Sequence, residues 1–175
     1  EQLRHDRDMG LLANAPYARK DGMPPVLPPG YAGASAEDLE DLGLTQEDLS
    51  PDMAVFRTEG KGGKPHYVLS FRGTETGAGM GTLANDVGVD VLQATGFQTA
   101  AYERAMATAK SMGDSAARNG HSVELTGHSK GGGQAAAASA VSGLPATTFN
   151  GAGVHEGTLE RSNVTPEQRK AARTN

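Results

Sequence analysis

Cysteine is absent from the 175 residues, and so are long apolar runs and any excess of basic charge. Without cysteine the chain has no disulfide framework, no thiolate metal site and no cysteine nucleophile, an absence that fits an oxidising or a reducing compartment equally well. No apolar run approaches the roughly 20 residues that cross a bilayer, and the charged start "EQLRHDRDMG" lacks the pattern of a secretory signal. We therefore expect a soluble chain without a transmembrane segment.

The charge balance is acidic. The 16 lysines and arginines are outnumbered by 21 aspartates and glutamates, which gives a formal net charge of −5. Proteins that bind phosphate backbones without sequence preference need a basic face, so nucleic acid is not expected as a partner. The length fits one folded unit with a sizeable hydrophobic core.

Residues 1–52 are predicted to form N-terminal helices and a loop rich in proline and glycine. Apolar residues at loosely helical spacing predict a first helix within residues 1–20, and "DGMPPVLPPGYAG" then interrupts the pattern. Ser35 and Thr45 are each followed three residues later by aspartate, a signal for a helix N-terminus. One or two short acidic helices are expected there.

Residues 53–175 are predicted to form the main α/β core. "MAVFRTEG" and "HYVLSFRG", joined by "KGGKP", have the pattern of a hairpin. A glycine-rich stretch up to Gly96 predicts a long loop, and a helix follows from Phe97 to Asn119. After it come a strand in "HSVELT", a helix in "KGGGQAAAASAVSG", a strand in "PATTFNG" and a last helix in "VTPEQRKAARTN". Strands that alternate with helices predict a mostly parallel sheet flanked by helices, with the hairpin as its antiparallel edge.

The segment "VELTGHSKGGGQAAAAS" places Ser129 between Gly127 and Gly131. A random chain of this composition contains Gly-x-Ser-x-Gly roughly one time in five, so the five letters alone are weak evidence. The context is stronger, because a predicted strand leads into the motif and a predicted helix leads out of it. That order is typical of a nucleophile elbow, a sharp turn in which the two glycines leave room for the backbone and the serine hydroxyl is lifted above the sheet.

An attacking serine needs hydrogen-bond donors for the oxyanion that it creates. The backbone amide of Lys130, at the start of the predicted helix, is the first candidate. Thr74, in the "SFRGTET" loop that follows an earlier strand, is the second. The sequence therefore gives Ser129, Thr74 and Lys130 as candidate catalytic residues.

The pair of motifs "YVLSFRGTET" and "VELTGHSKGG", with "TTFNGAG" after them, resembles the lipase class 3 group of α/β hydrolases and the bacterial secreted phospholipase effectors related to it. The resemblance covers about residues 53 to 155. It implies an α/β-hydrolase-like fold, Ser129 as nucleophile, and Thr74 and Lys130 as oxyanion-hole residues. Relatives generally carry leucine where this chain has Lys130, and a cation beside the nucleophile could favour anionic head groups.

The acid and the base of a catalytic triad are not evident. In the α/β-hydrolase order both follow the serine, yet the 46 residues after Ser129 contain no aspartate. His155 and nearby glutamates are the substitutes that the chain offers, and a loop histidine without catalytic role is the alternative for His155. We expect this chain to be an N-terminal portion of the domain, with the Asp and the His in a downstream segment or a second chain.

The other titratable residues give little indication of a metal site or a catalytic role. His5 and His66 have no partner at metal-ligand spacing, and we infer no metal and no other cofactor. Asp86 and Asp90 could hold a cation or orient a lid, and a capping or solvated role is the alternative.

Two classes of function follow. The first is a serine ester hydrolase, a lipase or phospholipase that acts on lipid or phospholipid esters through an acyl-enzyme; by the resemblance it would be a secreted or delivered bacterial effector that acts at membrane lipids. The second is a catalytically inert α/β domain that serves as a binding module or as a toxin fragment recognised by an immunity protein. A peptidase or thioesterase shares the elbow but would need a different acyl pocket.

Overall fold

A computed structural model describes residues 1–16, 24–72 and 90–149, with the backbone alone for residues 90–99. The elements are α1 (Gln2–Asn14), β1 (Ala32–Gly33), α2 (Ala36–Asp41), the 3-10 turn η2 (Gln46–Asp48), β2 (Met53–Glu59), the 3-10 turn η3 (Lys61–Gly63), β3 (Pro65–Phe71), α3 (Asp90–Asn119), β4 (Ser122–His128), α4 (Lys130–Ser142) and β5 (Ala146–Phe149).

The five strands of this part of the chain form one mixed sheet in the order β1-β2-β3-β4-β5. The β2–β3 hairpin is antiparallel, as predicted, and β3, β4 and β5 run parallel to one another. The α/β-hydrolase-like fold class expected from the sequence is confirmed. The pairing register puts Met53, Phe71 and Gly127 in one row, so the end of β2 that holds Met53 lies at the same edge of the sheet as the carboxyl ends of β3 and β4.

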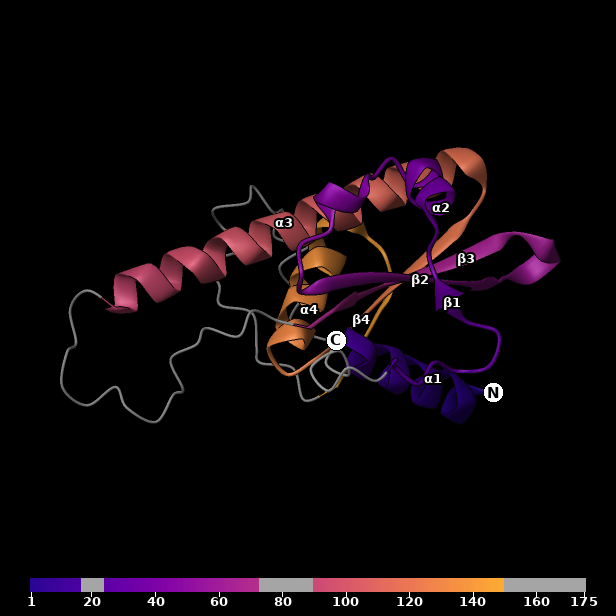
Figure 1. The fold of residues 1–175 in the computed structure, drawn as a ribbon, viewed down its shortest axis with the longest axis horizontal. Helices are drawn as coiled ribbons and strands as arrows, with labels where there is room; N and C mark the ends of the chain where they lie inside the picture. The colour runs from indigo at the N-terminus through magenta and orange to yellow at the C-terminus, as the bar shows by residue number, and fades with distance from the viewer. Residues whose placement is uncertain (17–23, 73–89, 150–175) are drawn as a thin grey trace.

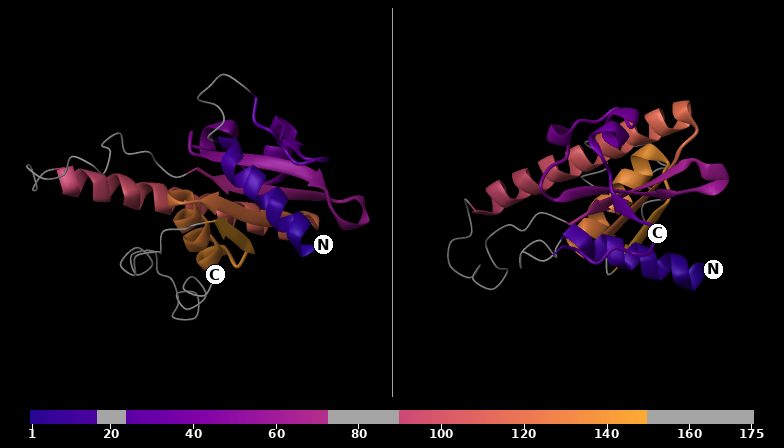
Figure 2. Two further views of the ribbon diagram at one scale, coloured as in Figure 1. Left: turned by 90° about the horizontal axis from the view of Figure 1, so that it is seen from below. Right: turned by 45° about the vertical axis from the view of Figure 1, so that its right-hand side comes forward.

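Helices cover both faces of the sheet (Figure 1). On one face, alanines of α3 and α4 pack against Leu69, Phe71 and Leu125 in the largest core cluster. On the other face, α1 packs against Phe56 and Val68. Adjacent residues of β3 thus point to opposite faces, as the period of two in a strand requires. The turned views in Figure 2 show α1 lying across the sheet.

Two buried hydroxyls of the sheet fasten α1. Ser70 donates a hydrogen bond to the Leu12 carbonyl at 2.8 Å. The Thr126 hydroxyl shares its one proton between the Met9 carbonyl at 3.2 Å and the Thr147 carbonyl of β5 at 2.9 Å. Buried hydroxyls need partners, and these two find them in backbone carbonyls of the helix. Residues 1–16 are therefore packed onto the α/β core, while the domain boundary at residue 52 stays a prediction.

The two short helical elements after the proline-rich loop begin at the capping residues that the sequence predicted. Ser35 and Asp38 form a complete capping box at the start of α2. At Thr45 the Asp48 carboxylate accepts a hydrogen bond from the Thr45 amide at 2.6 Å, but this signal opens a single 3-10 turn rather than a second α-helix.

The long helix differs from its prediction. α3 begins at Asp90 rather than Phe97 and runs for 30 residues to Asn119, so part of the expected loop is helical. The loop was predicted from its glycines, including Gly96. A glycine in a helix costs only about 1 kcal/mol relative to alanine, too little to end a helix of this length.

A cluster of ionisable side chains joins α1 to the sheet near the start of β4. Glu124 is 8% exposed; its Oε2 lies 2.9 Å from His5 Nε2 and 3.9 Å from His66 Nε2. Its Oε1 accepts a hydrogen bond from Thr147 at 3.1 Å. The hydrogen bond to Glu124 raises the pKa of His5, with Asp6 adding to the effect, whereas burial lowers the pKa of His66.

We predict that His5→Gln lowers the free energy of unfolding by about 0.5 kcal/mol near pH 6, because the His5 side chain is 39% exposed and its pairing is screened by water. A His pKa raised by folding gives stability that is full below the unfolded value of about 6.5 and lost as pH rises through the folded pKa. Folding lowers the pKa of His66, which changes stability with pH in the opposite direction. Burial, the main cause, is the same in both proteins, and the smaller part that comes from the charge of His5 is lost in the variant.

The measurement is urea unfolding of the wild type and the variant at about pH 6 and about pH 9. The difference in unfolding free energy should shrink towards zero at the higher pH. An equal difference at both pH values would mean that His5 acts through packing rather than through its charge.

Candidate active site

Ser129 occupies a strained turn between β4 and α4. Its backbone φ is 53° and its ψ is −118°, and among the described residues it is the one non-glycine with positive φ. Such a conformation costs about 1–3 kcal/mol and is typical of functional sites. Ser129 is exposed, and its side chain does not cap α4 although the residue stands at the N-cap position. The hydroxyl is therefore presented to solvent at the edge of the sheet.

The two glycines of the motif are required by close backbone packing. A Cβ on Gly127 would lie 2.2 Å from the Gly131 carbonyl oxygen. A Cβ on Gly131 would lie 2.0 Å from the Phe71 carbonyl oxygen, on the neighbouring strand. Both contacts are with backbone atoms, which cannot move aside as a flexible side chain could. The first glycine closes the turn and the second lets α4 approach the end of β3.

Backbone pairing ties the elbow to both neighbours of β4. The Ser129 amide donates to the Phe149 carbonyl at 2.9 Å, at the end of β5. Phe71, the last residue of β3, pairs with Gly127 of the elbow, and the Arg72 amide that follows it donates to the Asp52 carbonyl beside β2 at 2.7 Å. The chain that leaves β3 therefore starts next to the elbow.

The amide of Lys130 is the first of α4, and the first amides of a helix have no carbonyl partner within it. The partial positive charge of a helix N-terminus adds to the attraction for an anion. These features give the Ser129 turn the parts that an oxyanion site needs on the α4 side.

Other predicted site residues lie outside the described part of the chain. Thr74, two residues beyond Arg72, belongs to this group, as do Asp86, His155 and the glutamates at 156, 160 and 167. Asp90 is the first residue of α3, and its side chain is not described. The structure thus locates Ser129 and Lys130, and the roles of Ser129, Thr74 and Lys130 remain proposals.

The Glu124 cluster was missed by sequence reasoning. His5 and His66 were considered for metal ligation and dismissed for lack of a nearby partner in sequence. Their shared partner lies 119 residues from His5 along the chain, so no spacing rule could have found it. Glu124 stands near the amino end of β4, the opposite end from Ser129, so the cluster is separate from the elbow.

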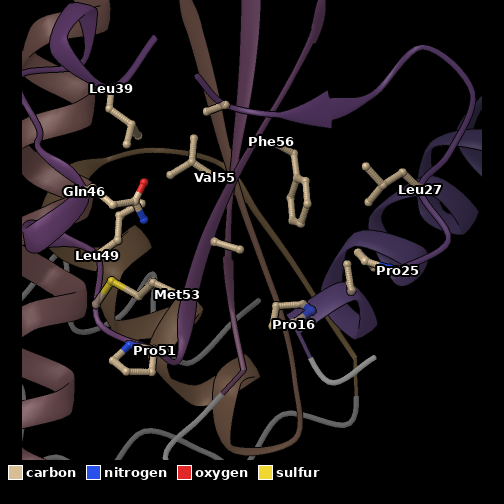
Figure 3. A pocket seen from close by; sticks show the side chains of 14 residues that line it. Pro16, Pro25, Leu27, Leu39, Gln46, Leu49, Pro51, Met53, Val55 and Phe56 are labelled. Atoms are coloured by element: carbon tan, nitrogen blue, oxygen red, sulfur yellow. The ribbon is translucent and has the colours of Figure 1, made fainter. Parts of the chain in front are cut away.

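An apolar pocket of about 260 Å³ lies along the edge of β2 (Figure 3). Leu39, Leu49 and Val55 line one side of it, and Leu27 and Phe56 line the other. The pocket is separated from the elbow by β3, because the sheet order is β2-β3-β4. We assign it no part in the chemistry at Ser129.

Comparison with known proteins identifies the family of the chain. The family described as phospholipase-like, Tle-like phospholipase domain, matches residues 8–175. The chain belongs to this family. The chain is also 35% identical over 141 residues to a protein from Serratia liquefaciens named extracellular phospholipase A1. That alignment covers 81% of this chain and 41% of the relative, so the chain spans about two fifths of the relative's length.

The family match covers both of the separated motifs, the one that ends β3 and the one at the elbow. A Tle-like phospholipase domain reaches from α1 through the elbow and includes the segments that the structure leaves undescribed. Within the described residues, no helix is both long and apolar enough to span a bilayer.

Proposed function

We propose that this Tle-like phospholipase domain is the nucleophile-bearing part of a serine ester hydrolase that cleaves an acyl ester of phospholipids. The observation that carries the proposal is the positive-φ turn at Ser129, held between β4 and α4 by two glycines that have no room for a side chain. Membership of a phospholipase family and similarity to an extracellular phospholipase A1 support the lipid substrate and secretion of the protein.

The reaction would proceed through an acyl-enzyme. Ser129 Oγ attacks the ester carbonyl carbon and its proton passes to a histidine base. The carbonyl oxygen becomes an oxyanion held by the amides of Lys130 and Thr74. When the tetrahedral intermediate collapses, the bond to the glycerol oxygen breaks and that oxygen takes the proton from the base. Water then repeats the sequence on the acyl-enzyme, which releases the fatty acid and restores the serine.

The base and its orienting carboxylate are assigned to parts of the protein outside the described residues. His128, at the end of β4, precedes the nucleophile, and the His5 and His66 rings lie at the opposite end of the strand. A segment outside the described residues would bring the base and its carboxylate to the side of β5, next to Ser129.

The test is covalent labelling of the full-length protein with a fluorophosphonate probe, followed by measurement of its intact mass. One adduct is expected on the wild type and none on Ser129→Ala, together with fatty-acid release from phospholipid vesicles by the wild type alone. Labelling and hydrolysis that persist in Ser129→Ala would overturn the proposal. A folded, unlabelled and inactive wild type would favour the inert binding module instead.

A further inference from the structure

Lys130 places an exposed ammonium group directly beside the proposed nucleophile. It is the first residue of α4, and both it and Ser129 are exposed. In a helix the Cα–Cβ bond tilts toward the N-terminus, so a side chain at the first position leans out past the helix end. At this helix, that direction is the sheet edge above which the Ser129 hydroxyl stands.

Within residues 1–16, 24–72 and 90–149, no carboxylate forms an ion pair with the Lys130 ammonium. The first turn of α4 contains no acidic residue. Asp52 lies at the same edge but beyond β3, where it accepts a hydrogen bond from Ser50. Glu124, the buried carboxylate of β4, lies at the other end of that strand. As far as the described residues go, the charge of Lys130 is therefore left to attract an anionic ligand.

We propose that the Lys130 side chain binds the phosphodiester anion of the phospholipid whose ester Ser129 attacks, and so makes the site prefer phospholipids to uncharged glycerides. This proposal rests on the proposed function and adds a specificity role to a residue whose backbone amide serves the oxyanion.

The chemistry of the substrate fits this placement. In a glycerophospholipid the scissile ester and the phosphate are attached to the same glycerol unit, so an ester carbonyl at Ser129 keeps the phosphate within reach of a four-carbon lysine stem. Lysine is a common phosphate ligand because its ammonium acts as a compact point charge with rotatable donors. The dipole of α4 adds to the attraction for an anion at the same helix end.

Because the chain as a whole is acidic, a single cation at the site has a larger effect on the binding of an anion. The chain has a formal net charge of −5 and would on average repel an anionic lipid. A single cation next to the reacting ester offsets that repulsion where the phosphate must lie. It also selects against diacylglycerols, which are identical at the ester but lack the anion.

The experiment compares two soluble substrates, a short-chain phosphatidylcholine and the matching short-chain diacylglycerol, both below their micelle concentrations. Using monomers removes any effect of a charged lipid surface. For the full-length wild type, Lys130→Met, Lys130→Arg and Lys110→Met, kcat/KM is measured on each substrate. Lys110 is an exposed lysine of α3 and serves as the matched control.

Lys130→Met should lower the ratio of phospholipid to diacylglycerol kcat/KM about tenfold, since a charge-assisted contact to the phosphate is lost. Lys130→Arg should restore most of the ratio, and Lys110→Met should leave it at the wild-type value. Added salt should lower the wild-type ratio and have less effect on that of Lys130→Met.

The experiment distinguishes a failure of the proposed function from a failure of the phosphate contact alone. If Ser129→Ala still hydrolyses both substrates, the proposed function fails and this inference with it. If hydrolysis of both substrates depends on Ser129 but the ratio is the same in Lys130→Met and the wild type, the proposed function stands and the phosphate contact is disproved.

Discussion

Replacing Ser129 with glycine is expected to abolish hydrolysis and at the same time to stabilise the fold. The serine holds φ at 53°, a conformation that strains residues with a Cβ but that glycine adopts without penalty. Relief of this strain should raise the free energy of unfolding by about 1 kcal/mol, even after the greater flexibility of glycine in the unfolded chain is counted. Loss of the nucleophile should lower kcat by about 10⁴-fold or more.

Ser129→Ala is the matched control, because it removes the same hydroxyl but keeps the Cβ. Chemical unfolding of the wild type and both variants, together with fatty-acid release, gives the comparison. Alanine should match glycine in lost activity without the gain in stability. Equal stability of Ser129→Ala and Ser129→Gly would show that the turn is not strained in the protein and would remove the main structural argument for a nucleophile at this position.

The sequence predicted the elbow well because each of its features is local. The apolar strand, the two glycines and the alanine-rich helix are contiguous in the chain, so one segment specifies the turn from Gly127 to Gly131. The β2–β3 hairpin was predicted for the same reason, since its turn connects adjacent segments.

Features that depend on distant contacts were not predicted. The hydroxyls of Ser70 and Thr126 find α1 carbonyls 58 and 117 residues away, and Glu124 finds His5 at 119 residues. The two-residue strand β1 was also missed, because it lies in a stretch of small residues and exists through its pairing with Arg57 and Phe56 of β2. Short-range patterns contain no information on such pairings.

One contact between distant segments was nevertheless indicated by a single residue of the sequence. Gly131 was predicted to allow the turn itself, and the structure shows in addition that its missing side chain makes room for the end of β3. Its role is thus to bring the α4 N-terminus, with the Lys130 amide, against the strand that leads to Thr74. The placement of the Lys130 amide, one of the two proposed oxyanion donors, depends on this contact.

Gly131→Ala is therefore expected to be among the most damaging single substitutions in the chain. The added Cβ would lie 2.0 Å from the Phe71 carbonyl oxygen and 2.7 Å from its carbonyl carbon, distances that require the α4 N-terminus to move away from β3. We expect a loss of about 3 kcal/mol or more in unfolding free energy, at the upper end for overpacking, because the clash is with backbone. In molecules that still fold, the two oxyanion donors would separate and hydrolysis should fall at least a hundredfold.

Gly33→Ala provides the control, since a Cβ on Gly33 meets no atom within 4 Å. It should leave the unfolding free energy within about 0.5 kcal/mol of the wild type. The measurement is thermal and urea unfolding of both variants, with hydrolysis assayed on the folded fraction. A Gly131→Ala protein as stable and active as Gly33→Ala would mean that α4 does not approach β3 this closely. The pairing of Lys130 and Thr74 at one oxyanion would then lose its geometric basis, and the second donor would have to come from another part of the protein.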